Sequence, residues 1–262
     1  MLTSLLCSNA EKKINLYILH TTLTQEDIAK IRRIEPGRLT VNEIKVGGDF
    51  LKNAPVTNRY PTEMYYRIFA SRILPKELER ILYLDPDIVV INPIDELYNI
   101  DFEDNFFAAA SHTSDLWMNA INERRLSLPK GSSYFNSGVL MMNLPLLRAN
   151  QDEAAVFEYI ESHKSGLLLP DQDVLNGLYA GMIKEVDMLK YNLSERCFGI
   201  YNMKPDRWGE KPLDIAWVLK NTGIIHYCGR IKPWKGFYFG EFDRFYKEYE
   251  RIASEAGYIE LD

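Results

Sequence analysis

Apolar and polar residues alternate in two different rhythms along the first fifty residues. In residues 14–20 (INLYILH) and 38–46 (RLTVNEIKV), apolar side chains recur at about every second position, which predicts β-strands. Between them, residues 24–36 open with Thr24 as a candidate helix N-cap and end at a proline, which predicts a helix. This stretch therefore predicts a β-α-β unit.

The rest of the chain continues the alternation of strands and helices. Helices are predicted over residues 60–75, 145–163, 171–180 and 241–256. Strands are predicted in NFFAAA, SGVLMMNL, GMIKEV and TGIIHY, and on both sides of the Asp-Pro-Asp turn in RILYLDPDIVVINP. That last stretch is continuously apolar, which favours a parallel strand covered on both faces. We therefore predict one α/β domain with a doubly wound, mostly parallel sheet, whose ligands bind beyond the carboxyl ends of the strands.

Composition and charge narrow the class of protein. With 262 residues, 46% of them hydrophobic, the chain is long enough for one large α/β domain. The formal net charge is −6 and no more than two Lys or Arg residues adjoin, so nucleic acid is not an expected partner. The cysteines Cys7, Cys197 and Cys228 lack CxxC spacing, which suits free thiols in a cytoplasmic protein. No apolar run approaches the roughly 18 residues of a membrane span, so a soluble protein is expected.

Two carboxylates follow the apolar run of residues 80–84. Asp85 and Asp87 are two positions apart in an extended segment, so both can point to one side, about 6.6 Å apart at roughly 3.3 Å per residue. Pro86 stiffens this geometry by fixing its own φ and keeping Asp85 out of the helical region. A divalent cation with a phosphate-bearing substrate is one interpretation of the pair. An ordinary surface turn is the other.

A second polar cluster lies in IIHYCGRIKPW, residues 224–234. His226 directly follows an apolar strand, and Gly229 and Lys232 follow at steps of three. An imidazole can ligate a metal, a glycine permits close approach of the backbone, and a lysine can neutralise phosphate oxygens. The alternatives are a core histidine bonded to backbone and a solvated lysine.

Two further clusters contain carboxylate and amide side chains. Asp171, Gln172 and Asp173 stand at the predicted start of a helix, where capping is an alternative explanation for Asp171 but not for Gln172. Asn136 and Gly138 stand at the mouth of another predicted strand, where a plain turn is the alternative. The chain contains no P-loop and no GxGxxG motif, which disfavours a metal-dependent phosphotransferase.

Four motifs together resemble those of the family 8 glycosyltransferases. LYLDPD, YFNSGVLMMNL, LPDQDVLNGL and HYCGRIKPW occur in the order and spacing of this retaining group, which includes bacterial lipopolysaccharide galactosyl- and glucosyltransferases and glycogenin. MYYRIFASRILP is similar to the helix that precedes the metal motif. The resemblance implies a Rossmann-like domain of the GT-A type over residues 1–262.

The resemblance also implies a role for each candidate residue. A hexose would pass from a UDP-hexose to a hydroxyl of a glycan, glycolipid or lipopolysaccharide-type acceptor, with retention of configuration. The implied ligands of Mn²⁺, or alternatively Mg²⁺, are Asp85, Asp87 and His226. Gly229 and Lys232 would contact the diphosphate, and Arg67, Asn136 and Asp171 the donor sugar. Gln172 would lie at the reactive face of the anomeric carbon, with Asp173 as the fallback carboxylate.

One departure from the family pattern concerns the first strand. Family members usually begin with a strand that ends in an acidic turn and a tyrosine, whereas MLTSLLCSNAEKKINLYILH begins in what resembles the following helix. Without that strand we expect an exposed apolar edge, unpaired backbone groups, low stability and weak UDP affinity. The alternative function is an inactive, N-terminally truncated sugar- or nucleotide-binding module.

The C-terminal segment, residues 237–262, is expected to form a helical cap on the acceptor side. Its apolar residues on helical spacing are Phe242, Phe245, Tyr249, Ile252 and Ala256. An interfacial helix is the alternative, with Arg244, Lys247 and Arg251 drawing the enzyme to a membrane. We accordingly expect a cytoplasmic protein, with peripheral attachment to the inner face of the membrane as a further option.

Overall fold

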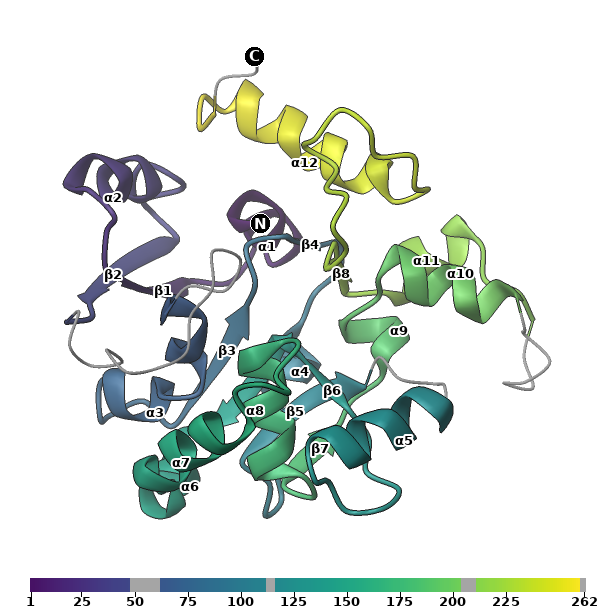
Figure 1. The fold of residues 1–262 in the computed structure, drawn as a ribbon. Helices are drawn as coiled ribbons and strands as arrows, with labels where there is room; N and C mark the ends of the chain where they lie inside the picture. The colour runs from purple at the N-terminus through teal and green to yellow at the C-terminus, as the bar shows by residue number, and fades with distance from the viewer. Residues whose placement is uncertain (48–61, 112–115, 204–210, 260–262) are drawn as a thin grey trace.

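The computed structural model describes residues 1–47, 62–111, 116–203 and 211–259 (Figure 1). Its strands are β1 (Ile14–His20), β2 (Leu39–Lys45), β3 (Arg80–Leu84), β4 (Ile88–Val90), β5 (Phe107–Ser111), β6 (Phe135–Asn143), β7 (Ile183–Glu185) and β8 (Ile224–His226). Its longer helices are α1 (Leu2–Ser8), α2 (Gln25–Arg32), α5 (Leu116–Arg125), α6 (Leu144–Asn150), α7 (Glu153–His163), α8 (Pro170–Tyr179), α10 (Glu195–Met203), α11 (Ile215–Asn221) and α12 (Asp243–Glu255). Short helical turns complete it: η1 (Thr62–Arg67), α3 (Ala70–Ile73), α4 (Asp95–Tyr98) and α9 (Met188–Tyr191).

The described strands form three sheets. The largest has the order β3-β6-β5-β7, and two pairs, β1-β2 and β4-β8, stand beside it. The predicted α/β class is confirmed, but the sheet is mixed rather than mostly parallel. The pairs β1-β2 and β5-β7 are parallel, whereas β3-β6, β5-β6 and β4-β8 are antiparallel. Continuous apolarity in RILYLDPDIVVINP was therefore a wrong guide to strand direction, because it reports packing on a strand's faces and not the direction of its neighbours.

Helix caps divide the predicted helices more finely than apolar spacing does. Thr24 and Asp27 form a capping box at the start of α2, as the Thr24 prediction required. The predicted helix over residues 145–163 is two helices, because Asp152 accepts hydrogen bonds from the backbone of Ala154 and Ala155 and starts α7 anew. The described part of the predicted helix over residues 60–75 is the 3₁₀ turn η1 followed by α3.

The C-terminal helix α12 covers the core beside β4. Phe242, at its start, and Phe245 are buried and pack with Val89 and Ile225. Figure 1 shows α12 lying across the end of the molecule above α1. The apolar face of this helix is thus used inside the fold. The three cysteines are free thiols, as predicted.

A groove separates β1 from β3. A cavity of about 880 Å³ is lined by both strands along most of their length, and it reaches the turn at Asp85 and Pro86. All five residues of β3 are only partly buried, although four of them are apolar. The interior of the molecule is therefore open between these two strands.

The backbone groups facing this groove lack strand partners within the described part of the chain. Asp85 N–H donates to Gly138 O (2.8 Å) and Leu144 N–H donates to Glu79 O (3.0 Å). The backbone N–H and C=O groups of the odd-numbered residues of β3 therefore point toward β6. Arg80, Leu82 and Leu84 then turn their backbone groups toward the groove. An apolar edge without a strand partner was expected at the place of the family's usual first strand, and β3 has such an edge among the described strands.

The backbone groups of β1 divide in the same way. Ile14 N–H donates to Arg38 O and Val46 N–H donates to His20 O, each at 2.8 Å, so the even-numbered residues of β1 face β2. The backbone N–H and C=O groups of the odd-numbered residues of β1 consequently point toward the groove. Two strand edges thus confront each other across the cavity.

Hydrogen exchange along β3 should alternate from residue to residue. We expect the amides of Leu82 and Leu84 to exchange roughly 100-fold or more faster than those of Ile81 and Tyr83, because only the latter face β6. Amide exchange followed by NMR measures this. Equal protection of all four amides would contradict an open edge on β3.

Candidate active site

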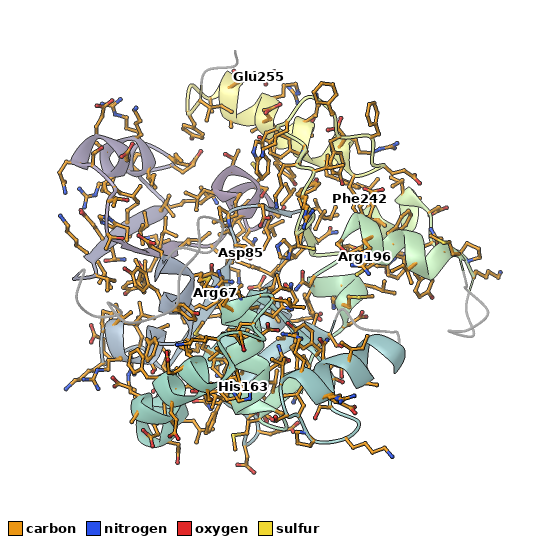
Figure 2. All side chains as sticks on the ribbon, in the orientation of Figure 1. Arg67, Asp85, His163, Arg196, Phe242 and Glu255 are labelled. Atoms are coloured by element: carbon orange, nitrogen blue, oxygen red, sulfur yellow. The ribbon has the colours of Figure 1, made fainter. Side chains whose placement is uncertain are left out.

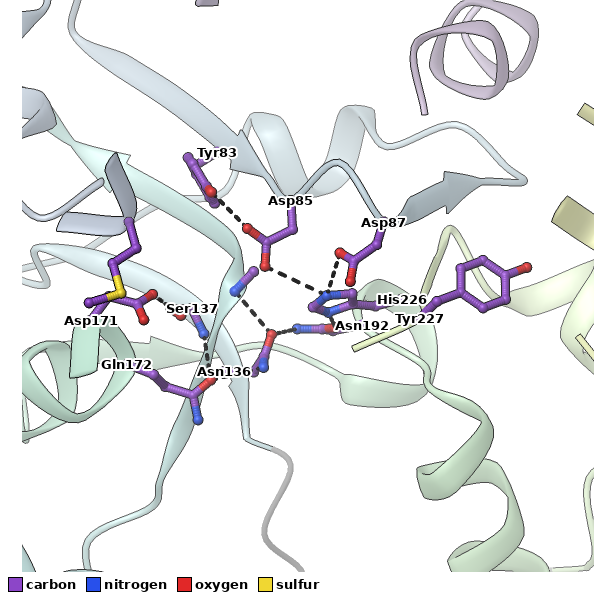
Figure 3. Close-up of polar contacts among 12 residues, drawn as sticks. Tyr83, Asp85, Asp87, Asn136, Ser137, Asp171, Gln172, Asn192, His226 and Tyr227 are labelled. Atoms are coloured by element: carbon purple, nitrogen blue, oxygen red, sulfur yellow. Dashed lines mark hydrogen bonds and ion pairs between the residues drawn. The ribbon is translucent and has the colours of Figure 1, made fainter. Parts of the chain in front are cut away.

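The turn between β3 and β4 brings two carboxylates to the end of β8. Tyr227 N–H donates to the backbone oxygen of Asp87 (2.9 Å), which extends the β4-β8 pairing beyond Ile88 and His226. His226 Nε2 then lies 3.2 Å from Asp87 Oδ1 and 3.7 Å from Asp85 Oδ2 (Figure 3). One ligand atom from each of the three side chains lies within 4.8 Å of the other two. The three residues predicted as metal ligands therefore converge.

The chemistry of these atoms fits a divalent cation. His226 Nδ1 contacts Asn192 Oδ1 (2.9 Å), and since an amide oxygen can only accept, Nδ1 carries a proton and, in the neutral ring, Nε2 presents a lone pair. Asp87 Oδ1 and His226 Nε2 are buried without a hydrogen-bond partner. Oxygen and imidazole donors of this kind suit Mn²⁺ or Mg²⁺.

Lys232 flanks the group of predicted metal ligands Asp85, Asp87 and His226, here called the metal cluster, from outside, and Gly229 lies nearby in the same loop. Lys232 Nζ forms an ion pair with Asp87 and donates to Tyr227 O (2.6 Å). Burial disfavours the charged form of Asp87, but the polar and cationic groups around it outweigh burial and lower the pKa of this carboxyl to about 2. Gly229 lies in the same exposed loop, with no side chain or backbone packed closely against it in the described chain. The two predicted diphosphate residues thus lie beside the metal cluster.

Arg67 connects the metal cluster to the predicted sugar site. It lies 3.1 Å from Asp85 Oδ1 through Nη1 and 3.2 Å from Asp171 Oδ2 through Nε, and Figure 2 shows Arg67 and Asp85 together near the centre of the molecule. Burial opposes its charge, but Tyr83, Asp171 and Asp85 outweigh that effect and raise the pKa of the guanidinium. Arg67 also lies over the ring of Tyr83, 4.3 Å from its centroid. The guanidinium is therefore held in one position.

Gln172 is held by two residues near the start of β6. Asn136 Nδ2 donates to Gln172 Oε1 (3.0 Å), and Ser137 N–H donates to the same oxygen (3.3 Å). Ser137 Oγ donates to Asp171 Oδ2 (3.0 Å), so Asp171 pairs with Arg67 and Ser137 rather than capping α8. The residues predicted to hold the donor sugar form one connected group.

Gly138 is small because β6 passes directly beside the metal cluster. A Cβ at this position would lie 2.3 Å from His226 Cε1 and 2.5 Å from Asp85 Oδ2. No side chain fits there without displacing a predicted metal ligand. The glycine is thus part of the site and not of a turn, since it lies within β6.

Asp173 is placed differently from its neighbours. It is fully buried, and Arg125 donates to both of its oxygens (2.6 and 2.8 Å). Tyr134 Oη (2.5 Å) and the backbone N–H groups of Leu168 (2.7 Å) and Leu169 (3.0 Å) donate to it as well. Five donors bind this carboxylate, which is typical of an ion pair that stabilises the fold. Gln172 therefore stays the candidate residue at the reactive face of the sugar.

Three residues in this group were not predicted as site residues from the sequence. Tyr83 Oη donates to Asp85 Oδ1 (2.7 Å), Ser137 bridges Asp171 and Gln172, and Asn192 binds His226. Tyr83 and Ser137 lie within the motifs LYLDPD and YFNSGVLMMNL, but no role was predicted for either residue from the sequence. Asn192 lies between a short helix and an apolar residue, where an asparagine is unremarkable. Only the folded arrangement identifies them.

A family model matches most of the chain. The model described as glycosyl transferase family 8 matches residues 1–237. The chain belongs to glycosyl transferase family 8. The resemblance inferred from the four motifs is thereby confirmed.

Two relatives of this family 8 chain are lipopolysaccharide glycosyltransferases by name. It is 29% identical over 238 residues to lipopolysaccharide 1,2-glucosyltransferase of Escherichia coli, covering 89% of this chain and 68% of the relative. It is 27% identical over 241 residues to lipopolysaccharide 1,3-galactosyltransferase of Salmonella typhimurium, covering 89% and 67%. The chain thus spans about two thirds of the length of these relatives.

The family fold is also found in solved structures. The galactosyltransferase LgtC, crystallised with donor and acceptor sugar analogues, matches with a TM-score of 0.76 at 22% identity, covering 100% of this chain and 91% of that one. The glycosyltransferase GlyE of Streptococcus pneumoniae matches with a TM-score of 0.68 at 21% identity, covering 97% and 58%. The GT-A fold of this family 8 member is thereby shown.

Loss of the Asp173 charge should destabilise the fold. Asp173→Asn leaves Arg125 without its buried partner, so we expect the free energy of unfolding to fall by about 3–5 kcal/mol in urea denaturation. Glu248→Gln removes an exposed ion pair with Arg251 and should leave the free energy of unfolding nearly unchanged. A stable Asp173→Asn protein that loses only turnover would instead assign Asp173 to catalysis.

Proposed function

We propose that this chain is a metal-dependent retaining hexosyltransferase that moves a hexose from a UDP-hexose to a hydroxyl of a glycan, glycolipid or lipopolysaccharide-type acceptor. One observation carries the proposal: the buried, unpartnered acceptor atoms of Asp87 and His226 converge with Asp85 beside the hydrogen-bonded group of Asn136, Asp171 and Gln172. Membership of family 8 and the names of its relatives support the class of reaction.

The residues around the cluster would neutralise the negative charge of the donor's diphosphate. Asp85, Asp87 and His226 would hold Mn²⁺, or Mg²⁺, which acts as a Lewis acid for the diphosphate. Lys232 would exchange its contact with Asp87 for the diphosphate oxygens, because a mobile ammonium is a good point charge for phosphate. Gly229 would let the backbone approach the same oxygens.

The sugar-binding residues would fix the anomeric carbon. Arg67, Asn136 and Asp171 would bind hexose hydroxyls, since all three lie in the network around Gln172. The bond from the anomeric carbon to the diphosphate breaks, the acceptor oxygen forms the new bond on the same face, and its proton leaves with the diphosphate. An amide is a poor nucleophile, so Gln172 would steady the positive charge that develops on the sugar.

Binding of UDP-sugars should require both the metal and Asp87. In isothermal titration we expect UDP, UDP-glucose and UDP-galactose to bind with Mn²⁺ present, and Asp87→Ala to weaken binding at least about 100-fold, because loss of an outer-shell partner alone costs 10–100-fold. Asp104→Ala removes an exposed carboxylate elsewhere and should bind as the wild type does.

Two other outcomes would point away from this enzyme. Binding that is equally tight without Mn²⁺ would contradict the metal site. Binding of carbohydrate without Mn²⁺ and without release of UDP would favour the inactive binding module, which the open edge of β3 supports. Weak UDP binding that strengthens when a strand is supplied in the groove would attribute the weakness to the incomplete sheet.

We also propose that the loop between β8 and α12 lies against an acidic membrane surface near the site. No helix in the described ranges is long and apolar enough to cross a membrane. Phe237 and Phe239 are 77% and 92% exposed, and Ile231 is 61% exposed, in a loop that also carries exposed Arg230 and Lys235. Exposed aromatic and basic residues together suit a membrane interface.

Helix α12 is the weaker choice for such contact. Its apolar residues Phe242 and Phe245 are buried in the core. Arg251 is paired with Glu248 and Glu255, so this cation is already neutralised. The loop therefore replaces the helix as the candidate surface for peripheral attachment.

Vesicle binding should depend on the aromatic residues of the loop. We expect co-sedimentation with anionic vesicles to exceed that with zwitterionic ones, and the double variant Phe237→Ser and Phe239→Ser to bind at least about tenfold more weakly, since each buried Phe contributes about 1.5–3 kcal/mol. Met203→Ser changes an equally exposed side chain on α10 and serves as the control. Equal binding by all three proteins would remove the proposal.

A further inference from the structure

Asn192 is held against the metal cluster by its own backbone. It ends α9, where its N–H donates to Met188 O (3.0 Å). The next residue, Leu193, donates to Ile224 O (3.0 Å) and accepts from His226 N–H (2.8 Å), so it pairs with β8. Both Asn192 and His226 are almost completely buried, at 0% and 1% exposure. The amide therefore lies at a fixed place beside the imidazole.

A chain of side-chain hydrogen bonds runs from His226 to Gln172 through Asn192. His226 Nδ1–H donates to Asn192 Oδ1 (2.9 Å), and Asn192 Nδ2 donates to Asn136 Oδ1 (3.0 Å). Asn136 Nδ2 in turn donates to Gln172 Oε1 (3.0 Å) (Figure 3). Every bond points in the same direction, from the metal cluster toward the reactive face. We call this series the amide relay.

Two acceptors compete for the single proton of a neutral His226 ring. Asn192 Oδ1 lies on the Nδ1 side at 2.9 Å, and Asp87 Oδ1 lies on the Nε2 side at 3.2 Å. A proton on Nε2 would be attracted by the carboxylate and would occupy the lone pair that a cation needs. Asn192 is the group that keeps the proton on the opposite nitrogen.

The other end of Asn192 acts on the sugar site. Asn136 Oδ1 accepts from Asn192 and from Gly138 N–H (3.0 Å), which orients its amide so that Nδ2 meets Gln172. Asn192 thus supplies one of the two hydrogen bonds to Asn136 Oδ1, and the other comes from the backbone of β6 itself. One buried amide therefore touches both halves of the site.

We propose that Asn192 is a positioning residue that sets the tautomer of His226 for metal binding and, through Asn136, the orientation of Gln172. It contacts neither reacting atom and acts only through its neighbours. The roles in metal and sugar binding rest on the proposed function, but the tautomer of His226 can be measured on the protein alone. Coupling between the metal and sugar sites follows, because one side chain orients both.

Two substitutions separate the two roles of Asn192. Asn192→Asp keeps an acceptor for His226 Nδ1–H but has no N–H for Asn136. Asn192→Ala removes both bonds. Asn202→Asp is the matched control, because Asn202 also uses both amide atoms, on Leu213, away from the relay.

The first measurement is the tautomer of His226, read from its side-chain ¹⁵N signals without metal at neutral pH and assigned with His226→Gln. We expect a proton on Nδ1 in the wild type, in Asn192→Asp and in Asn202→Asp. In Asn192→Ala we expect a shift of the proton to Nε2. An unchanged tautomer in Asn192→Ala would overturn the role toward His226.

The second measurement is the affinity for Mn²⁺ alone and then, at saturating Mn²⁺, for UDP and UDP-glucose or UDP-galactose. We expect Asn192→Ala to bind Mn²⁺ about 10–100-fold more weakly, and Asn192→Asp to bind it at least as tightly as the wild type. Asn192→Asp should lose the preference of the wild type for a UDP-sugar over UDP. A UDP-sugar preference unchanged in Asn192→Asp would overturn the role toward Gln172.

Failure of the two hypotheses can be distinguished. A wild type that binds neither Mn²⁺ nor a UDP-sugar contradicts the proposed function, and the tautomer measurement then decides the role toward His226. A wild type that binds both, with Asn192→Ala equal to it, contradicts the amide relay alone. Circular dichroism of each variant checks that the fold is retained.

Discussion

The meeting of three acceptor groups in a partly buried place is the constraint on which the rest of the site depends. Asp87 Oδ1 and His226 Nε2 approach to 3.2 Å with no proton between them as long as His226 donates to Asn192. Arg67 and Lys232 approach the carboxylates from outside and offset their charge, but neither lies between the acceptors. A cluster of this kind is unfavourable unless the fold imposes it, which is common where a cation binds.

The fold imposes this arrangement through strand pairing and through Gly138, which has no side chain. The antiparallel pairing of β4 with β8 sets His226 opposite the residue that follows Asp87. β6 then passes close enough that only Gly138 fits beside the imidazole. Three segments far apart in the chain thus meet at one point, and the hydrogen bonds around Asn136 and Asn192 tie that point to Gln172.

The same site lies at the end of an open groove. β3 carries Asp85 at its end, yet it is paired only with β6 among the described strands, and its other edge borders the cavity. The ion pair between Arg67 and Asp85 and the bond from Tyr83 to Asp85 therefore matter more than they would beside a complete sheet. These side-chain contacts add to the backbone hydrogen bond from Asp85 N–H to Gly138 O in holding the carboxylate.

The sequence alone determined the elements and most of the chemistry. Local signals such as Thr24, the apolar runs and the spacing of Asp85 and Asp87 act over a few residues, so they can be read without a fold. Strand direction, the enclosure of Asp173 by Arg125 and the contact of Asn192 with His226 were decided only by the tertiary structure. The physical reason is that each depends on which distant segment becomes the neighbour, and a single strand or side chain looks the same in sequence whichever neighbour it acquires.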